Sequence, residues 1–99
     1  MTKIGTIPYI ESGDTIETRY PTLATGSAEQ FVLQTDKDMF TLMVTINFEA
    51  ERLYYKIMKS DQTFLCLNIP LIEDVNLCNG YLSGYTLFLQ GHDLYFGEA

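Results

Sequence analysis

The strongest constraint on the fold is a stretch in which every second residue is apolar. Its five apolar positions are Phe40, Leu42, Val44, Ile46 and Phe48. Threonine and asparagine fill the positions between them, with Met43 as the one apolar exception. Successive side chains of a β-strand point to opposite faces, whereas a helix would scatter these five around its circumference. The stretch therefore predicts a strand with one buried face.

Similar runs follow along the chain and are separated by short polar turns. Residues 52–59 and 63–69 both alternate, and in the second run we expect Leu65, Leu67 and Ile69 to share one face, opposite Cys66. Residues 81–90 predict the last long strand, with a bulge or a close backbone approach at Gly84, and residues 94–96 predict a short closing strand. Runs joined by short turns are typical of an antiparallel meander.

The spacing of these runs predicts an all-β fold. No stretch of ten residues carries the pattern of an amphipathic helix. Strands that recur every ~8–12 residues are typical of small sandwiches and barrels. We therefore expect a small antiparallel β-barrel or sandwich of about six to seven strands, with little helix. The less regular residues Ile72, Val75 and Leu77 are expected to plug one end of the barrel.

The first part of the chain has a different character. Residues 1–29 are rich in Thr, Gly, Ser and Pro and keep no helical period. We interpret residues 1–29 as an extended N-terminal arm or short strands, and residues 30–99 as the barrel or sandwich domain. A length of 99 residues fits a single domain.

The charge balance excludes several classes of partner. Six basic and thirteen acidic residues give a formal net charge of −7. Binding to nucleic acid or to an anionic membrane needs a basic surface, so we expect neither partner. No apolar run reaches the ~18–20 residues that span a bilayer, and the first residues lack the apolar core of a secretory signal.

Residues that could carry catalysis or bind a metal are few. His92 and Asp93 are adjacent, and we interpret them as a polar turn between two strands. Cys66 and Cys78 are too far apart in sequence for a paired zinc-ligand motif. We expect Cys66 to be a packing residue and Cys78, next to a glycine turn, to be more exposed. We predict no catalytic residue, no metal, no cofactor and no enzymatic activity.

The aromatic composition favours contacts with other proteins. The chain has seven tyrosines and six phenylalanines, which bury a large area and are enriched at protein interfaces. We expect Tyr54, Tyr81 and Tyr85 to lie on a face away from the core. The full set of interface candidates is Ile4, Ile7, Tyr9, Tyr54, Tyr81 and Tyr85.

Residues 30–96 resemble the baseplate plug family of tailed phages. The similarity is carried by residues 40–48, 52–57 and 68–77, and the most distinctive part is Ile69-Pro70-Leu71. Leu94-Tyr95-Phe96 is similar to the closing strand of the family. The chain departs from the family where Phe48 and Tyr55 replace tryptophan and where Asp61-Gln62 replaces an acidic-Gly turn.

The resemblance implies a virion structural protein, made in the host cytoplasm and located in the tail baseplate. Such a protein is a plug or hub component at the tail axis that organises or closes the tail tube. The implied partners are the baseplate hub, tail tube and spike proteins, together with a homo-oligomer within the virion. The alternative interpretation is a small β-sheet module that binds a ligand or a glycan, which an exposed aromatic cluster in a pocket would favour.

Overall fold

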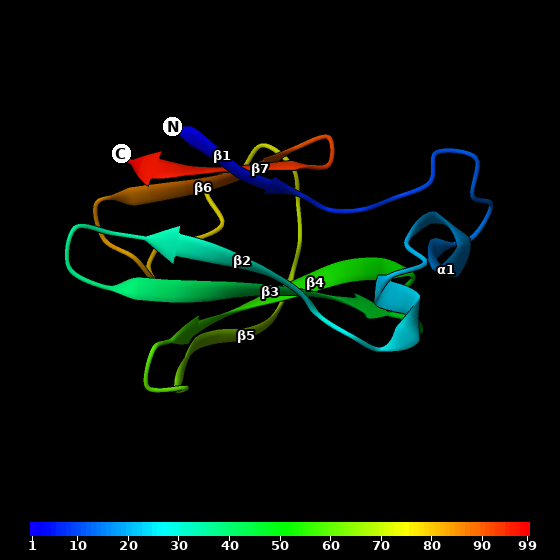
Figure 1. The fold of residues 1–99 in the computed structure, drawn as a ribbon, viewed down its shortest axis with the longest axis horizontal. Helices are drawn as coiled ribbons and strands as arrows, with labels where there is room; N and C mark the ends of the chain where they lie inside the picture. Colours follow the sequence, from blue (N-terminus) through cyan, green and yellow to red (C-terminus); the bar gives the residue numbers. More distant parts are fainter.

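Seven strands form two antiparallel sheets that stack into a sandwich (Figure 1). The structure is a computed structural model that describes residues 1–99. The strands are β1 (Thr2–Thr6), β2 (Glu29–Gln34), β3 (Met39–Asn47), β4 (Arg52–Lys59), β5 (Phe64–Pro70), β6 (Tyr85–Gln90) and β7 (Asp93–Glu98), and the helical turns are α1 (Ile16–Arg19) and η1 (Leu23–Thr25). The all-β prediction is confirmed, as a sandwich and not as a closed barrel.

The larger sheet has the strand order β2-β3-β4-β5 and contains the alternating stretch. Leu42 and Val44 of β3 are fully buried, which confirms the predicted inward face. Phe48 is the exception, with 47% of its surface exposed, because β3 ends at Asn47 and the chain turns there toward β4. The pleat of β3 therefore buries the middle of the alternating stretch, whereas Phe48, which follows the strand, is exposed.

The predicted faces of β5 are wrong because the strand is bulged. Ile57 of β4 pairs with Cys66 and Tyr55 pairs with Ile69, so β5 uses one residue more than β4 over this stretch. The extra residue changes which side chains point inward. As a result Cys66 is buried in the core, whereas Leu67 is 51% exposed.

The smaller sheet has the order β1-β7-β6, so the N-terminal segment belongs to the fold. Short strands were one form of the prediction for residues 1–29, and β1 is such a strand. The idea of an arm outside a domain that starts at residue 30 is wrong, because Ile7 and Leu23 are buried in the same core as the rest. Burial of Ile7 and Leu23 stabilises the fold, and it requires that residues 1–29 pack against the two sheets.

The two sheets meet along a seam between β1 and β2, where the ring of Phe31 lies against the backbone of Gly5. A Cβ atom added at Gly5 would come within 2.5 Å of two ring carbons of Phe31. Glycine is therefore required here by the close approach of a side chain to the backbone. Phe31 joins the sheets on this side of the sandwich.

The loop between β5 and β6, residues 71–84, closes the opposite side. The amide of Leu77 donates to the carbonyl of Leu87 at 2.8 Å, and the amide of Asp74 donates to that of Leu89 at 3.2 Å. The loop thus satisfies the edge of β6, which would otherwise offer unpaired backbone groups to other chains.

Two details of this region differ from the sequence-based expectation. Leu77 is buried as expected, but Ile72 and Val75 are exposed at 47% and 44%, so they do not plug the sandwich. The last long strand begins at Tyr85 and not at residue 81, because the chain turns at Gly84, whose φ is +82°. Gly84 therefore serves a turn before β6 and not a bulge within it.

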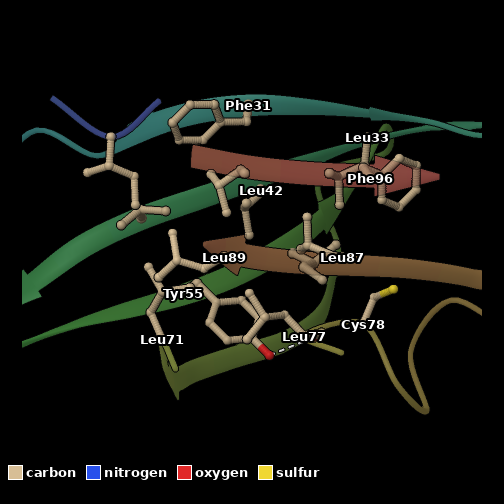
Figure 2. Packing of buried hydrophobic residues seen from close by; sticks show 14 of the residues in the cluster. Phe31, Leu33, Leu42, Tyr55, Leu71, Leu77, Cys78, Leu87, Leu89 and Phe96 are labelled. Atoms are coloured by element: carbon tan, nitrogen blue, oxygen red, sulfur yellow. Dashed lines mark hydrogen bonds between the residues drawn. The ribbon is translucent and has the colours of Figure 1, made fainter. Parts of the chain in front are cut away.

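The core is a single cluster between the sheets (Figure 2). Its buried members are Ile7, Leu23, Phe31, Leu33, Leu42, Val44, Leu53, Tyr55, Ile57, Cys66, Leu71, Leu77, Cys78, Leu82, Leu87, Leu89, Leu94 and Phe96. The one phenol among them is satisfied, since the hydroxyl of Tyr55 donates to the carbonyl of Leu77 at 2.6 Å (Figure 2). This bond ties the loop at residues 71–84 to β4.

Helix α1 is a single turn that Thr15 begins. The Thr15 hydroxyl accepts a hydrogen bond from the amide of Thr18, and the Thr18 hydroxyl accepts one from the amide of Thr15, which together form a capping box. Neither helical turn of the chain has the length and apolar character needed to cross a membrane.

Candidate functional site

The two isoleucines among the interface candidates belong to the interior. Ile7 is 1% exposed and is a core residue, so its prediction as an interface residue is wrong. Ile4 is partly buried and packs against the core cluster. Both positions were predicted from a segment taken to be an arm. Ile4 lies in β1, which pairs with β7, and Ile7 follows β1, where its amide donates to the carbonyl of His92 at 2.7 Å.

Tyr85 is also used within the chain, whereas Tyr81 is on the surface. The ring of Tyr85 stacks on Phe96 with centroids 5.4 Å apart, and its hydroxyl donates to the carboxylate of Asp36 at 2.8 Å. Tyr81 is 37% exposed. The two tyrosines line a shared depression next to the β2–β3 turn.

Tyr9 is 40% exposed and forms part of an aromatic cluster that the sequence did not reveal. Its ring stacks on the imidazole of His92, with centroids 3.3 Å apart and an interplanar angle of 11°. The hydroxyl of Tyr20 lies 3.1 Å from Nε2 of His92. His92 does stand in the β6–β7 turn, as expected, and there it meets two tyrosines from a distant part of the chain.

One surface with several exposed apolar side chains is the outer face of the larger sheet, meaning the side chains of β2–β5 that point away from the core. The register aligns Val32, Thr41, Met58 and Phe64 in one row across the four strands. The neighbouring row contains Gln30, Met43 and Lys56, and the next pairs Thr45 with Tyr54. Tyr54, an interface candidate, thus lies on this outer face.

Several apolar members of the outer face are half exposed. Val32 is 53% exposed, Leu67 51%, Met39 50% and Phe64 42%. Apolar side chains scattered singly over a surface are ordinary, but a contiguous patch marks a binding surface. The sequence signal for this patch was the presence of methionine and tyrosine at positions of β3 and β4 where an outward strand face usually has polar residues.

Charge is distributed unevenly between the larger sheet and the rest of the chain. The four strands carry three basic residues, Arg52, Lys56 and Lys59, and a single acidic residue, Glu29. Glu29 pairs in register with the buried Val44, so it is on the core-facing side of β2. All other carboxylates lie outside these strands, so no strand residue on the outer face is acidic in a chain of net charge −7. Glu49 of the β3–β4 turn lines a depression with Thr45 and Tyr54 at one end of this face. Lys56 Nζ lies 5.6 Å from the centroid of the Phe64 ring.

A second candidate site is a pocket at the end of the sandwich where α1 lies, here named the α1 pocket. Its volume is about 510 Å³. Four segments that are distant in sequence line it: α1 with its preceding loop, the start of β4, the residues after β5 and the β6–β7 turn. The lining side chains are Asp14, Thr15, Ile16, Arg19, Tyr20, Glu51, Arg52, Leu53, Leu71, Glu73, Leu89 and His92, together with Gly91.

The α1 pocket contains both arginines of the chain, and neither has a carboxylate partner. The two salt bridges of the molecule are Lys3–Asp93 and Lys59–Asp61. Arg19 is oriented by a different contact, since its Nε donates to the carbonyl of Gly13 at 3.0 Å. Burial raises the pKa of Tyr20 above its ordinary value, so its hydroxyl stays protonated at neutral pH.

The two thiols are buried and line neither surface. Cys78 is fully buried, so its predicted exposure is wrong, and its Sγ donates to the Asn76 side chain and to the Tyr85 carbonyl, each at 3.3 Å. Burial raises the pKa of Cys78 to about 11 and also raises that of Cys66. Both cysteines are free thiols, and the thiolate needed for nucleophilic or redox chemistry is disfavoured at neutral pH.

No family model, curated protein or solved structure matches this chain. Function therefore has to be argued from the surfaces themselves. No group of three or more His, Cys, Asp or Glu side chains is arranged to hold a metal ion. The two surfaces with distinctive chemistry are the outer face of the larger sheet and the α1 pocket.

Proposed function

We propose that this chain is a structural protein of the phage virion, a baseplate plug or hub component at the tail axis that organises or closes the tail tube through protein–protein contacts. The resemblance of residues 30–96 to the baseplate plug family supports the setting. The observation that carries the proposal is the outer face of the larger sheet, whose strands present apolar side chains and lysine and contribute no acidic residue to it.

The proposed occupant of the outer face is an apolar surface of a baseplate hub, tail tube or spike protein that carries carboxylates. Val32, Met58 and Phe64 supply an apolar row, which favours an apolar counterpart. Lys56 lies in the next row and is left without a carboxylate partner by the chain's own salt bridges. A carboxylate on the partner would complement it, which favours correct orientation and selects against wrong partners.

The homo-oligomer implied by the resemblance stays a prediction, and we do not expect it to form by stacking two outer faces. In a two-fold dimer the same patch contacts itself. Lys56 stands in the middle of β4, a central strand of the sheet, so two symmetry-related lysines would approach each other. Like charges placed opposite each other are destabilising.

Co-purification from cells that express this chain with the hub, tail tube and spike proteins of its virus tests the proposal. The wild-type chain is expected to form a stable complex with at least one of them. Val32→Asp introduces a charge into the outer face and should weaken that complex by at least about tenfold.

Val75→Asp is the matched control, because Val75 is similarly exposed but lies in the loop between β5 and β6. This variant should retain the complex. The proposal fails if the wild-type chain binds none of these proteins, or if both variants bind as the wild type does. Circular dichroism of each variant establishes that the sheet structure is intact.

A further inference from the structure

We infer that the α1 pocket is a binding site for a neutral saccharide. The inference does not rest on the docking proposal, because the residues argued to dock a partner, Val32, Lys56, Met58 and Phe64, do not line the pocket. It gives a location and a ligand class to the alternative of a ligand- or glycan-binding module.

The volume and the apolar lining of the pocket suit a small organic ligand. A volume of about 510 Å³ lies within the range of roughly 300–1,000 Å³ that is usual for such sites. Buried leucines from three different segments form its apolar part, namely Leu53, Leu71 and Leu89. Charged and hydroxyl-bearing side chains are placed around them, which is the usual division between burial and orientation in a ligand site.

The mixed charge of the lining selects a neutral ligand. Arg19 and Arg52 contribute two guanidinium groups, while Asp14, Glu51 and Glu73 contribute three carboxylates. An anion would meet the three carboxylates, and a cation would meet the two guanidinium groups. A neutral polyol meets no like charge, so this lining disfavours phosphates and multiply charged anions relative to a sugar.

Hydroxyl groups also match the hydrogen-bonding capacity of these side chains. Each sugar hydroxyl both donates and accepts, so it can donate to a carboxylate and accept from a guanidinium N–H. The planar fork of an arginine offers two parallel N–H donors, which suits two neighbouring hydroxyl oxygens. Because no carboxylate of the chain pairs with Arg19 or Arg52, these donors remain available to a ligand.

The walls of the pocket are held in place before any ligand arrives. A Cβ at Gly13 would lie 2.6 Å from the backbone nitrogen of Arg19, so only glycine lets the loop close onto α1. His92, another lining residue, is held between the ring of Tyr9 and the hydroxyl of Tyr20. A pre-formed wall reduces the ordering cost of binding, which favours affinity for a small ligand.

Two measurements on the full chain test this inference. The first is binding of the labelled protein to an array of neutral and charged glycans. The second is a titration of the ¹⁵N-labelled protein with glucose, galactose and N-acetylglucosamine, followed through the backbone amides. We expect at least one neutral saccharide to bind on the array, and its titration to shift amides in residues 13–20, 51–53 and 89–92. Arg52→Gln should weaken that binding by about tenfold or more, because a hydrogen bond from a charged donor is lost.

Lys59→Gln is the matched control, since it removes one positive charge from β4 outside the pocket, and it should bind as the wild type does. Three results would overturn the inference: no neutral glycan binds, the shifted amides lie elsewhere, or Arg52→Gln and Lys59→Gln behave alike. Shifts of the same amides by inorganic phosphate but by no sugar would also overturn it, and would identify an anion site instead.

Discussion

The outer faces of the two sheets differ in how they use their polar groups. On the smaller sheet, the carboxylate of Asp93 accepts a hydrogen bond from the Thr6 hydroxyl at 2.6 Å and pairs with Lys3 at 3.3 Å. On the larger sheet, Lys56 Nζ lies over the ring of Phe64, 5.6 Å from its centroid. The first face pairs the charges of Lys3 and Asp93 within the chain, while the second leaves exposed apolar side chains and a cation without a carboxylate partner. The difference between these faces is the basis of the docking proposal.

The largest effect on stability is expected from a charge placed on the core-facing side of β3, and a charge on its outward side is the control. Val44→Asp would bury an unpaired carboxylate in the core, and the cost of more than about 4 kcal/mol is comparable to the stability of a small domain. Thr45→Asp places the same carboxylate on the outer face and should change stability by about 1 kcal/mol or less. Circular dichroism and urea denaturation should show an unfolded first variant and a folded second one. Equal losses in both would mean that the outer face is covered by the chain itself.

The next largest effect on stability is expected at the seam between β1 and β2, where the two sheets meet. Gly5→Ala would bring a methyl group within 2.5 Å of the Phe31 ring, and such overpacking costs about 1–3 kcal/mol. The cost should be smaller in a Phe31→Leu background, because a smaller side chain leaves room for the methyl group. Urea denaturation of the two single variants and the double variant measures this coupling, and strictly additive losses would show that the two residues do not touch.

Two reciprocal isosteric exchanges compare the outer faces directly. Val32→Thr on the larger sheet should leave the stability of the free chain within about 0.5 kcal/mol but weaken the complex with a tail protein. Thr6→Val on the smaller sheet removes the hydrogen bond to Asp93 and should leave the complex unchanged. Thermal denaturation combined with the co-purification assay separates the two effects. The comparison fails if Thr6→Val is the variant that loses the partner.

The smallest effect is the acid response of the smaller sheet. The hydrogen bond from Thr6, followed by contact with Lys3, holds the pKa of Asp93 below its ordinary value. A carboxylate whose pKa is lower in the folded state stabilises the fold above its unfolded pKa, and this contribution disappears as the pH falls through the folded pKa. Thr6→Val and Lys3→Gln should therefore each raise the pKa of Asp93. An NMR titration of the Asp93 carboxyl measures both, and an unchanged pKa in either variant would contradict the assignment.

The sequence predicted the strands where alternation is regular and failed where single residues alter it. The alternation of β3 follows from the pleat, so Leu42 and Val44 are buried as expected. The bulge in β5 involves Asn68, whose φ of +53° has no signature in the apolar pattern, and it reversed the predicted faces. The segment that contains Ile7 is held by a hydrogen bond from its amide to the carbonyl of His92, near the other end of the chain, and no local pattern encodes this contact.

The two candidate sites were accessible from the sequence to different degrees. The outer face could be anticipated in part, because Met43, Tyr54 and Met58 occupy outward positions of predicted strands. The α1 pocket could not, because Arg19, Arg52 and His92 come from segments that only the tertiary fold brings together. Of the interface candidates, Tyr54 lies on the outer face, whereas Ile7 belongs to the core.

Methionine methyl NMR of the labelled chain, with and without the hub, tail tube and spike proteins, tests the docking proposal most directly. Met39, Met43 and Met58 lie on the outer face, while Met1 lies beside Gly97 next to the smaller sheet and serves as an internal control. We predict that the ε-methyl signals of Met43 and Met58 shift or broaden when the partner is added, while that of Met1 keeps its position. A complex that perturbs Met1 and leaves Met43 and Met58 unchanged would contradict the proposal, as would the absence of any complex.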